Sequence, residues 1–537
     1  LGTFFMTLRR HGLRAAAALL AGLPLTAPAI ITLNDNIELE GFVQSQNILR
    51  TPQMDDAEFI MQRNTAQLES KYYFLKDSTA FGRFNTGKLE EATFTFVGRA
   101  VYDSIYDIRE SYRDDYIGRE NGPRQHEGKV REAYVDLLLP PFSLRLGKQQ
   151  IVWGETDNFR ALDVINPLDL SWHWVWESWE DIRIPLWAAR GVYDIGKIGK
   201  LEESFLEVVY IPWDVRQNVV ETDPNKPWSL YGPGAQAVAN SAFVGNDLLD
   251  LNLRVIDGRP GRKLENGQAG FRFKAVWGNV DFSFNYFYGF SADPRAKFRN
   301  EFTRVTPTAL NAVVETKYPR NHLVGFTANY SEEKYTQTVF RLETTFTTGV
   351  PITIAPGAPL SVDPNQDQFE TARRSVVMLA ADRPTWMKWL NKDRTIFLSS
   401  QIFWRRWLDY DESFRGLSSV LPASLNGVVQ PGRFFSVNND EIDQDEVVMT
   451  FSASTTYGDA GLLQPRFVFA FDPRSTGAYN QIYVDYLLST HVVLRFQQNL
   501  FWRFGGKEIG PWQLGDIWGH SNGQSRHESV FQFIYQF

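Results

Sequence analysis

The sequence predicts an all-β fold: a transmembrane antiparallel β-barrel of roughly sixteen to eighteen strands. Three observations predict it: apolar and polar residues alternate in many segments, short and long connections alternate between those segments, and the last segment is aromatic. At the C-terminal end, Phe531, Phe533, Tyr535 and Phe537 recur at every second position. A strand places such residues on one face. In a soluble sandwich this aromatic face would need a partner sheet, whereas in a membrane barrel it faces lipid.

The N-terminal segment has the layout of a secretory signal peptide. Arg9, Arg10 and Arg14 precede an apolar run, and small residues follow at Ala27 and Ala29. We therefore expect residues 1–29 to be cleaved and residues 30–537 to form one barrel. Removing three arginines and no acids changes the formal charge from 55 − 63 = −8 to 52 − 63 = −11. The mature chain is thus expected to be exported and acidic.

The composition excludes several other classes of protein. The chain has no cysteine, which rules out a disulfide framework and thiolate metal sites. No run of roughly 18 apolar residues follows the signal peptide, so the sequence predicts no helical span. The acidic charge, without a basic stripe, argues against nucleic-acid binding.

Alternation recurs along the chain at strand length. Residues 280–290, VDFSFNYFYGF, place aromatic side chains on one face and Asp281, Ser283 and Asn285 on the other. Runs of about ten to fourteen residues suit tilted membrane strands. Eighteen such runs begin near residues 36, 64, 91, 129, 143, 186, 202, 267, 280, 321, 335, 373, 394, 446, 464, 479, 491 and 524.

The connections between these runs alternate in length, as bacterial barrels with short periplasmic turns and long extracellular loops require. Short turns are predicted at 139–142, 197–201, 278–279, 331–334, 458–463 and 489–490. Long connections are predicted near 104–128, 153–185, 213–266, 291–320, 349–372, 407–445 and 505–523. Residues 77–90 and 383–393 are long for turns, and 473–478 is short for a loop.

The face opposite the aromatic residues carries charges of both signs. A charge on the lipid face costs about 2–4 kcal/mol near the midplane, so this face is predicted to line the lumen. Its charged residues are Glu38, Glu40, Arg99, Glu132, Asp136, Arg145, Arg341, Glu343, Arg405, Asp485, Arg495 and Arg503. Lys148 shares its face with Leu144 and Leu146 and breaks the pattern, which suggests a position at the interface. The lumen charges either pair with one another or contact a solute; both alternatives are open at this point.

The segment 144–170, LRLGKQQIVWGETDNFRALDVINPLDL, is the most distinctive part of the chain. A strand is predicted to end near Trp153, Gly154 permits a turn, and Asn166 with Pro167 marks a second turn. Five charged residues crowd the same loop: Glu155, Asp157, Arg160, Asp163 and Asp169. We expect this loop, within 153–185, to fold into the lumen as a constriction. The alternative is that the motif only anchors the barrel wall.

The WGE turn and the NPxD turn resemble the signature of a proteobacterial outer-membrane family, domain of unknown function 1302. Trp153, Gly154, Glu155, Asn166, Pro167 and Asp169 carry the resemblance. It implies a barrel without established enzymatic activity, associated with export of hydrophobic or lipid-like compounds alongside an inner-membrane pump. The closing strand, with Phe533, Tyr535 and Phe537, is similar to the terminal aromatic signal read by the barrel assembly machinery. Outer-membrane lipids and lipopolysaccharide are further expected partners.

Tryptophans cluster directly after the NPxD turn, at Trp172, Trp174, Trp176, Trp179 and Trp187. They suit either an interfacial aromatic girdle or a patch that contacts an apolar or sugar-like cargo. The girdle is the preferred interpretation, because aromatic belts are a general feature of barrels.

Enzyme-like signals are weak. Residues 519–523 match G-x-S-x-G, but this motif needs a strand before it and a helix after it. The histidines show no metal-binding spacing. The acidic residues Asp440, Glu441, Asp443, Asp445 and Glu446 lack the glycine of an EF-hand loop. We therefore predict no enzyme, no metal and no cofactor.

The sequence thus predicts a channel of the bacterial outer membrane that passes or hands over a small hydrophobic or lipid-like molecule. The leading alternative is a structural component of an envelope complex with a plugged lumen, and an outer-membrane esterase is a distant third.

Overall fold

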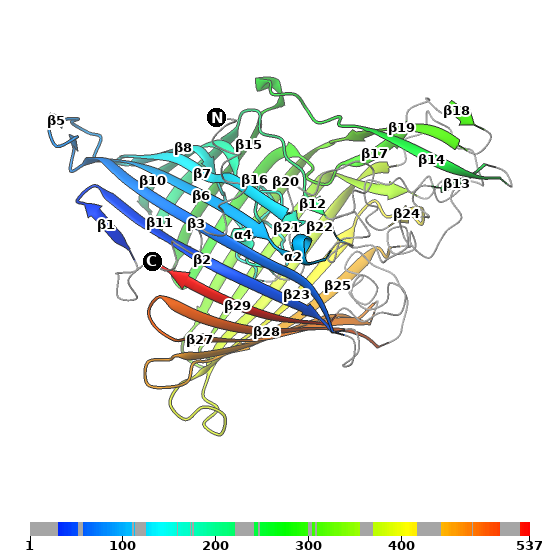
Figure 1. Cartoon of the computed structure of the whole chain (residues 1–537). Helices are drawn as coiled ribbons and strands as arrows, with labels where there is room; N and C mark the ends of the chain where they lie inside the picture. The colour runs from blue at the N-terminus through cyan, green and yellow to red at the C-terminus, as the bar shows by residue number, and fades with distance from the viewer. Residues whose placement is uncertain are drawn as a thin grey trace.

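Eighteen long strands pair edge to edge around a closed ring in the computed structural model (Figure 1). The structure describes residues 30–51, 57–109, 112, 125–157, 159–171, 173, 177–220, 241–244, 247–298, 303–306, 309–354, 369–415, 442–474, 476–504 and 527–537. In ring order the strands are β2 (Ile37–Arg50), β3 (Glu58–Lys76), β6 (Glu91–Asp103), β7 (His126–Leu139), β8 (Phe142–Gln149), β10 (Leu186–Ile198), β11 (Leu201–Ile211), β15 (Gln268–Trp277), β16 (Val280–Phe290), β20 (Arg320–Glu332), β21 (Thr338–Ile354), β22 (Phe369–Thr385), β23 (Ile396–Trp407), β25 (Asp445–Ser454), β26 (Leu463–Asp472), β27 (Gly477–Leu487), β28 (Val492–Arg503) and β29 (Glu528–Gln536). The predicted barrel, with eighteen strands, is confirmed.

The ring closes between the last strand and the first. β29 pairs antiparallel with β2, with Val43 opposite Tyr535. Beyond the strand, the amide of Gly41 donates to the carbonyl of Phe537 at 2.8 Å and the amide of Phe537 donates back at 2.9 Å. Every pairing in the ring is antiparallel. Because β29 pairs with β2, neither of these two strands leaves an open edge at the seam. Among the described residues, every helix is too short or too polar to cross a bilayer.

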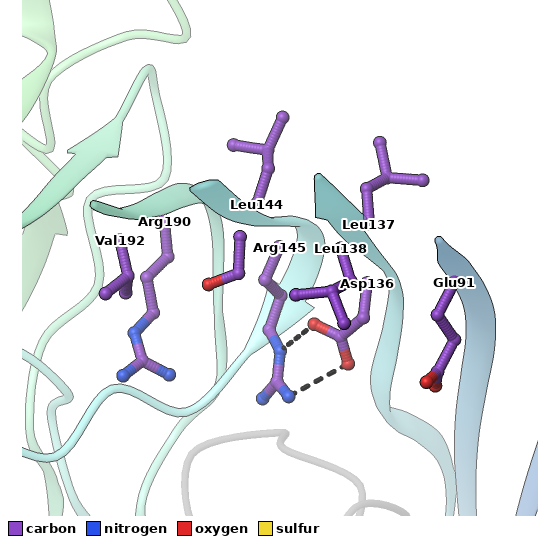
Figure 2. A pocket seen from close by; sticks show the side chains of 9 residues that line it. Glu91, Asp136, Leu137, Leu138, Leu144, Arg145, Arg190 and Val192 are labelled. Atoms are coloured by element: carbon purple, nitrogen blue, oxygen red, sulfur yellow. Dashed lines mark hydrogen bonds and ion pairs between the residues drawn. The ribbon is translucent and has the colours of Figure 1, made fainter. Parts of the chain in front are cut away.

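The two faces of the wall follow the predicted alternation. On β16, Phe284 is exposed on the outer face, while Ser283 and Asn285 are buried on the inner face. Figure 2 shows the same separation on the wall between β6 and β10, where Leu137 and Leu144 point away from the side on which their charged neighbours project. Apolar residues therefore face lipid and polar residues face the lumen.

The connections divide into two ends, as predicted. Short turns join strands at one end, where the longer turn 77–90 carries β4 (Thr79–Ala80) and β5 (Phe84–Asn85), and β1 (Ile31–Asn34) pairs with β2. At the other end lies a separate sheet, formed by β13 (Ser241–Val244), β14 (Asp247–Ile256), β17 (Arg295–Phe298), β18 (Thr303–Thr306) and β19 (Ala309–Lys317). Figure 1 shows this sheet extending beyond the barrel wall. Two further short elements outside the ring are η3 (Leu264–Asn266) and β24 (Phe414–Arg415).

The apolar core lies between the wall and segments that fold inward. α2 (Ile105–Ile108) packs Ile105 and Tyr106 against wall residues that include Ile48 and Val530. The segment between β8 and β10 contains β9 (Asp169–Leu170) and α4 (Trp179–Ile182), and β9 pairs in parallel with β12 (Val219–Val220). The barrel interior is thus partly filled by its own chain.

Candidate lumen constriction

The motif tryptophan anchors the inward-folded segment to the wall; this name denotes the described part of residues 150–185, without 158, 172 and 174–176. Trp153 is 2% exposed and packs edge to face on Phe287 of β16, with ring centroids 6.4 Å apart. Its indole nitrogen donates to Glu207 of β11 at 3.0 Å. The wall offers Gly270 beneath the ring, where a Cβ atom would lie 2.7 Å from the indole. Trp153 is therefore a buried anchor, with its polar atom satisfied.

One buried carboxylate holds both ends of the following turn. Glu343 of β21 accepts a hydrogen bond from the amide of Glu155 at 2.9 Å and another from the amide of Leu162. Gly154 permits this approach, because a Cβ atom there would lie 2.7 Å from the amide nitrogen of Asp163. The predicted lumen residue Glu343 thus binds backbone amides of the segment, and it is 1% exposed.

The acidic side chains beyond this turn meet polar groups of the same wall. The Glu155 carboxylate lies 3.5 Å from Lys274 of β15 and accepts from Asn329 of β20. Asp157 lies 2.7 Å from Arg341 of β21 and also accepts from Gln401 of β23. Both carboxylates are about one-third or more exposed. They provide the negative charge at this side of the segment.

Arg160, Asp163, Asn166 and Pro167 form the internal scaffold of the segment. Arg160 donates to the carbonyl of Asn166 at 2.8 Å. Asp163 accepts two bonds from Arg183, at 2.9 and 2.7 Å. The Asn166 side chain bonds the backbone of residues 151 and 184, and the Pro167 carbonyl accepts from residue 184. These bonds close the base of the segment, which is the anchoring role that the sequence left as an alternative.

Asp169 lies farther along the chain, on β9. Its carboxylate accepts from the amide of Ser171 at 3.2 Å and from the Ser171 hydroxyl. Another of its oxygens lies 3.9 Å from Lys129 of β7. Asp169 therefore caps a local turn and faces β7.

The second half of the segment is tied to the opposite wall. Arg99 of β6 pairs with Asp181 of α4. Arg131 of β7 donates to the carbonyls of Asp181 at 2.9 Å and Arg183 at 3.0 Å, and to that of Glu180. In ring order β21 is the eighth strand from β6, so in an eighteen-strand barrel the two walls stand almost opposite each other. The segment therefore crosses the lumen.

A buried histidine joins the segment to the closing strand. His173 lies 2.6 Å from Glu177 and 2.8 Å from Glu528 of β29, and Gln46 donates to Glu177 at 3.2 Å. Burial alone would lower the pKa of His173, but the two carboxylates raise it to about 10. The side chain is thus a cation at neutral pH.

Most of the predicted lumen charges pair with other wall residues. Arg145 and Asp136 form a bidentate pair at 2.7 and 2.9 Å, and they project with Glu91 and Arg190 into a cavity of about 260 Å³ (Figure 2). The other printed pairs are Glu38 with Tyr73, Glu40 with Lys71, Arg405 with Glu446, and Asp485 with Arg495. Glu132 is partly buried beside Arg131, and the side chain of Arg503 lies outside the described residues.

Three of the predicted lumen arginines, Arg99, Arg145 and Arg341, differ in their partners. Arg341 contacts Asp157, whereas Arg99 binds Asp181 and Arg145 binds Asp136. A second cavity, of about 650 Å³, lies near the short turns 386–395 and 455–463, and its lining includes Arg466, Tyr483 and Asp485.

The remaining candidate residues from the sequence are the tryptophan cluster, the acidic cluster near residue 443 and residues 519–523. Trp179 donates to the carbonyl of Asp157 at 2.8 Å, and Trp187 is exposed on the outer face. Asp443 pairs with Arg474 and Asp445 with Arg406. Trp172, Trp174, Trp176, Asp440, Glu441 and residues 519–523 lie outside the described residues. In the part of the chain that the structure describes, no group of three or more His, Asp or Glu side chains could hold a metal ion.

Several contact residues were missed by the sequence reasoning: Arg131, His173, Glu177, Glu207 and Glu528. A β-bulge between Val97 and Gly98 shifts the register of β7, so simple alternation does not place Arg131 inside. For Glu207 and Glu528, alternation in their strands gives the inner face, but their partners are distant in sequence.

The fold and this site together define a membrane-type β-barrel whose lumen is crossed by its own chain. Residues 79–509 match the model of the family described as "Protein of unknown function (DUF1302)", and the chain belongs to this family. No curated protein matches the sequence.

Solved structures of other barrels are similar to this chain at low sequence identity. OccAB3 of Acinetobacter baumannii has a TM-score of 0.45 at 9% identity, covering 93% of this chain and 99% of its own. OccK8 (OprE) of Pseudomonas aeruginosa has a TM-score of 0.45 at 8% identity, with 94% and 99% covered. A BenF-like porin from Pseudomonas fluorescens Pf-5 has a TM-score of 0.43 at 8% identity, with 94% and 100% covered.

Proposed function

We propose that this protein is a channel of the bacterial outer membrane in which residues 150–185 set the width and charge of the path. The observation that carries this proposal is the attachment of the segment to two nearly opposite walls, through Glu343 and Arg341 on one side and Arg99 and Arg131 on the other. A segment fixed across a lumen narrows it at that level. An eighteen-strand barrel is otherwise wide enough for an aqueous passage.

Charged groups of both signs support a water-filled path. Asp157 and Glu155 supply negative charge from the segment, while Arg466 and Asp485 line the cavity near the turn end. An apolar solute would need an apolar lining. We therefore infer that the lumen carries water and small polar solutes. Passage of a hydrophobic or lipid-like molecule, and the pump and lipid partners that the family resemblance implied, stay predictions.

A plugged scaffold is the second candidate, because an apolar cluster lies beneath the segment. Leu162 and Ile165 are buried together with Trp153 against wall residues that include Leu186 and Leu323. Such packing stabilises the segment in its inward position.

Single-channel recording in planar bilayers separates the two candidates. The full barrel is compared with a variant that lacks residues 156–159, which lie between the two amides that Glu343 binds. If the protein is a channel, the unmodified barrel gives stepwise increases in current, and the deletion variant gives larger ones. Heat-modifiable migration on gels serves as the control for folding. If the folded unmodified protein gives no steps and the deletion variant conducts, the plugged scaffold is the correct description. If neither conducts, the lumen is closed by other parts of the chain and the channel proposal fails.

A further inference from the structure

The barrel wall has a notch beside β7. β8 has eight residues, fewer than the roughly 9–11 that a tilted membrane strand needs. β7 pairs with β8 only over Ala133–Leu139, but with β6 it continues as far as His126. Residues 126–132 therefore extend beyond the last pair with β8. At about 3.3 Å per residue, roughly 23 Å of β7 thus lies beyond its described pairing with β8.

On the lumen face, other parts of the chain pack against this edge of β7. On the lipid face, a polar side chain lies beside it. On the lumen side, Arg131 binds carbonyls of α4, and Gln150 donates to the carbonyl of Glu180 at 3.2 Å. On the lipid side, Lys148 donates to the carbonyl of Val130 at 2.7 Å. Backbone groups cannot stay unpaired in lipid without a large penalty. The position of Lys148 is therefore explained by the missing strand neighbour.

The outer rim of the notch combines apolar side chains with cations. Two apolar side chains are exposed on the outer face there, Val130 of β7 and Trp187 of β10. Lys148 stands opposite Trp187 in the register of β8 and β10.

The position of a second cation follows from the same strand pair. Asp214 accepts a hydrogen bond from the amide of Trp187 at 3.1 Å. Asp214 also forms an ion pair with Arg216 at 2.6 Å, so this ion pair lies beside the Lys148–Trp187 pair of residues. Two cations, Lys148 and Arg216, thus lie at the rim with one carboxylate, Asp214, which is paired with Arg216.

Lys148 has spare binding capacity. Within the described ranges, no carboxylate lies within 4.0 Å of its ammonium group. An ammonium has three donors, and one of them serves Val130. A lysine on the lipid face is unfavourable unless it lies near the interface or binds an anion. The exposed Trp187, which stands opposite it, is typical of that interface.

We propose that this notch binds a phosphate-bearing membrane lipid. The phosphate contacts Lys148 and Arg216, and the acyl chains of the lipid lie over Val130 and Trp187. The two cations complement the phosphate, and the part of β7 beyond its pairing with β8 gives the headgroup polar neighbours. This site faces lipid, so it does not depend on conduction through the lumen.

Site-specific quenching tests the proposal. Because the chain has no cysteine, Val130→Cys in the full barrel can carry a single fluorophore. The barrel is placed in phosphatidylcholine bilayers, and brominated phosphatidic acid is added at increasing mole fraction. We expect quenching at position 130 to saturate at a low fraction of the lipid, while Leu379→Cys, on the outer face of β22, follows the bulk fraction.

Charge variants give the specificity control. Lys148→Gln with Arg216→Gln should weaken the binding about 30-fold, from the two interfacial cations. Arg83→Gln with Lys88→Gln, two exposed cations of the turn 77–90, should leave it unchanged. Single-channel conductance of the Lys148 and Arg216 variant should equal that of the unmodified barrel. Equal quenching at positions 130 and 379, or undiminished binding in the Lys148 and Arg216 variant, would show an ordinary aromatic girdle and overturn the proposal.

Discussion

Replacing Glu343 with alanine should release the inward-folded segment from β21. The substitution removes the acceptor of two amide hydrogen bonds, from Glu155 and Leu162, at a side chain that is 1% exposed. A buried donor left unsatisfied costs about 1–3 kcal/mol, so the two amides together contribute about 2–6 kcal/mol to the docked position. This changes the ratio of docked to released segment by about 30-fold to about 10⁴-fold. We therefore expect frequent transitions to a larger conductance in planar bilayers.

Thr345→Val is the matched control, because Thr345 is buried on the same face of β21, two residues away. It should keep the conductance of the unmodified protein. Both variants must show heat-modifiable barrels before they are compared. If a folded Glu343→Ala barrel shows the same conductance steps as the unmodified protein, Glu343 does not hold the segment on β21.

Three further predictions follow from the same contacts. Deleting Phe537 removes the paired hydrogen bonds to Gly41 at the seam, so the amount of folded barrel in outer-membrane fractions should fall several-fold; an unchanged amount would show that the terminal aromatic is dispensable. Glu155→Ala with Asp169→Ala should increase single-channel conductance, with most of the increase from Glu155, because Asp169 serves a local turn; equal conductance would contradict the constriction. Because the folded pKa of His173, about 10, lies above the ordinary value of about 6.5, its stabilisation is complete below about pH 6.5 and is lost as the pH rises toward 10. The melting temperature should therefore decline more steeply between pH 7 and pH 10 in the unmodified protein than in His173→Gln, and parallel declines would count against the cation.

The fold could be predicted from the sequence because the bilayer imposes a simple rule on each strand. Alternation identifies the lipid face of β16 from VDFSFNYFYGF alone, and the lengths of the connections give the two ends. Each of these signals is local. They require no knowledge of which residues meet across the lumen.

The contacts of the candidate site could be predicted only in part. The motif predicted that Trp153 and the charged loop matter, but the sequence does not show that Trp153 turns toward Glu207 rather than toward the lumen. Interior carboxylates look alike along a strand, so Glu343 could not be distinguished from Glu38 as the residue that binds the segment. The bond between His173 and Glu528 joins residues 355 positions apart, and no periodicity encodes such a pair.

The seam between β29 and β2 gives the barrel an order of assembly. Its partners lie almost at the two ends of the chain, with Arg50 opposite Glu528. Joining ends nearly 500 residues apart costs about 3 kcal/mol more loop-closure entropy than forming a ten-residue hairpin, at about 0.6 kcal/mol per doubling of length. Adjacent hairpins should therefore form first, and the growing sheet keeps two unpaired edges until its last strand arrives. During that interval each edge is a template for pairing with another chain, so a factor that occupies both edges would protect the barrel from aggregation until it closes.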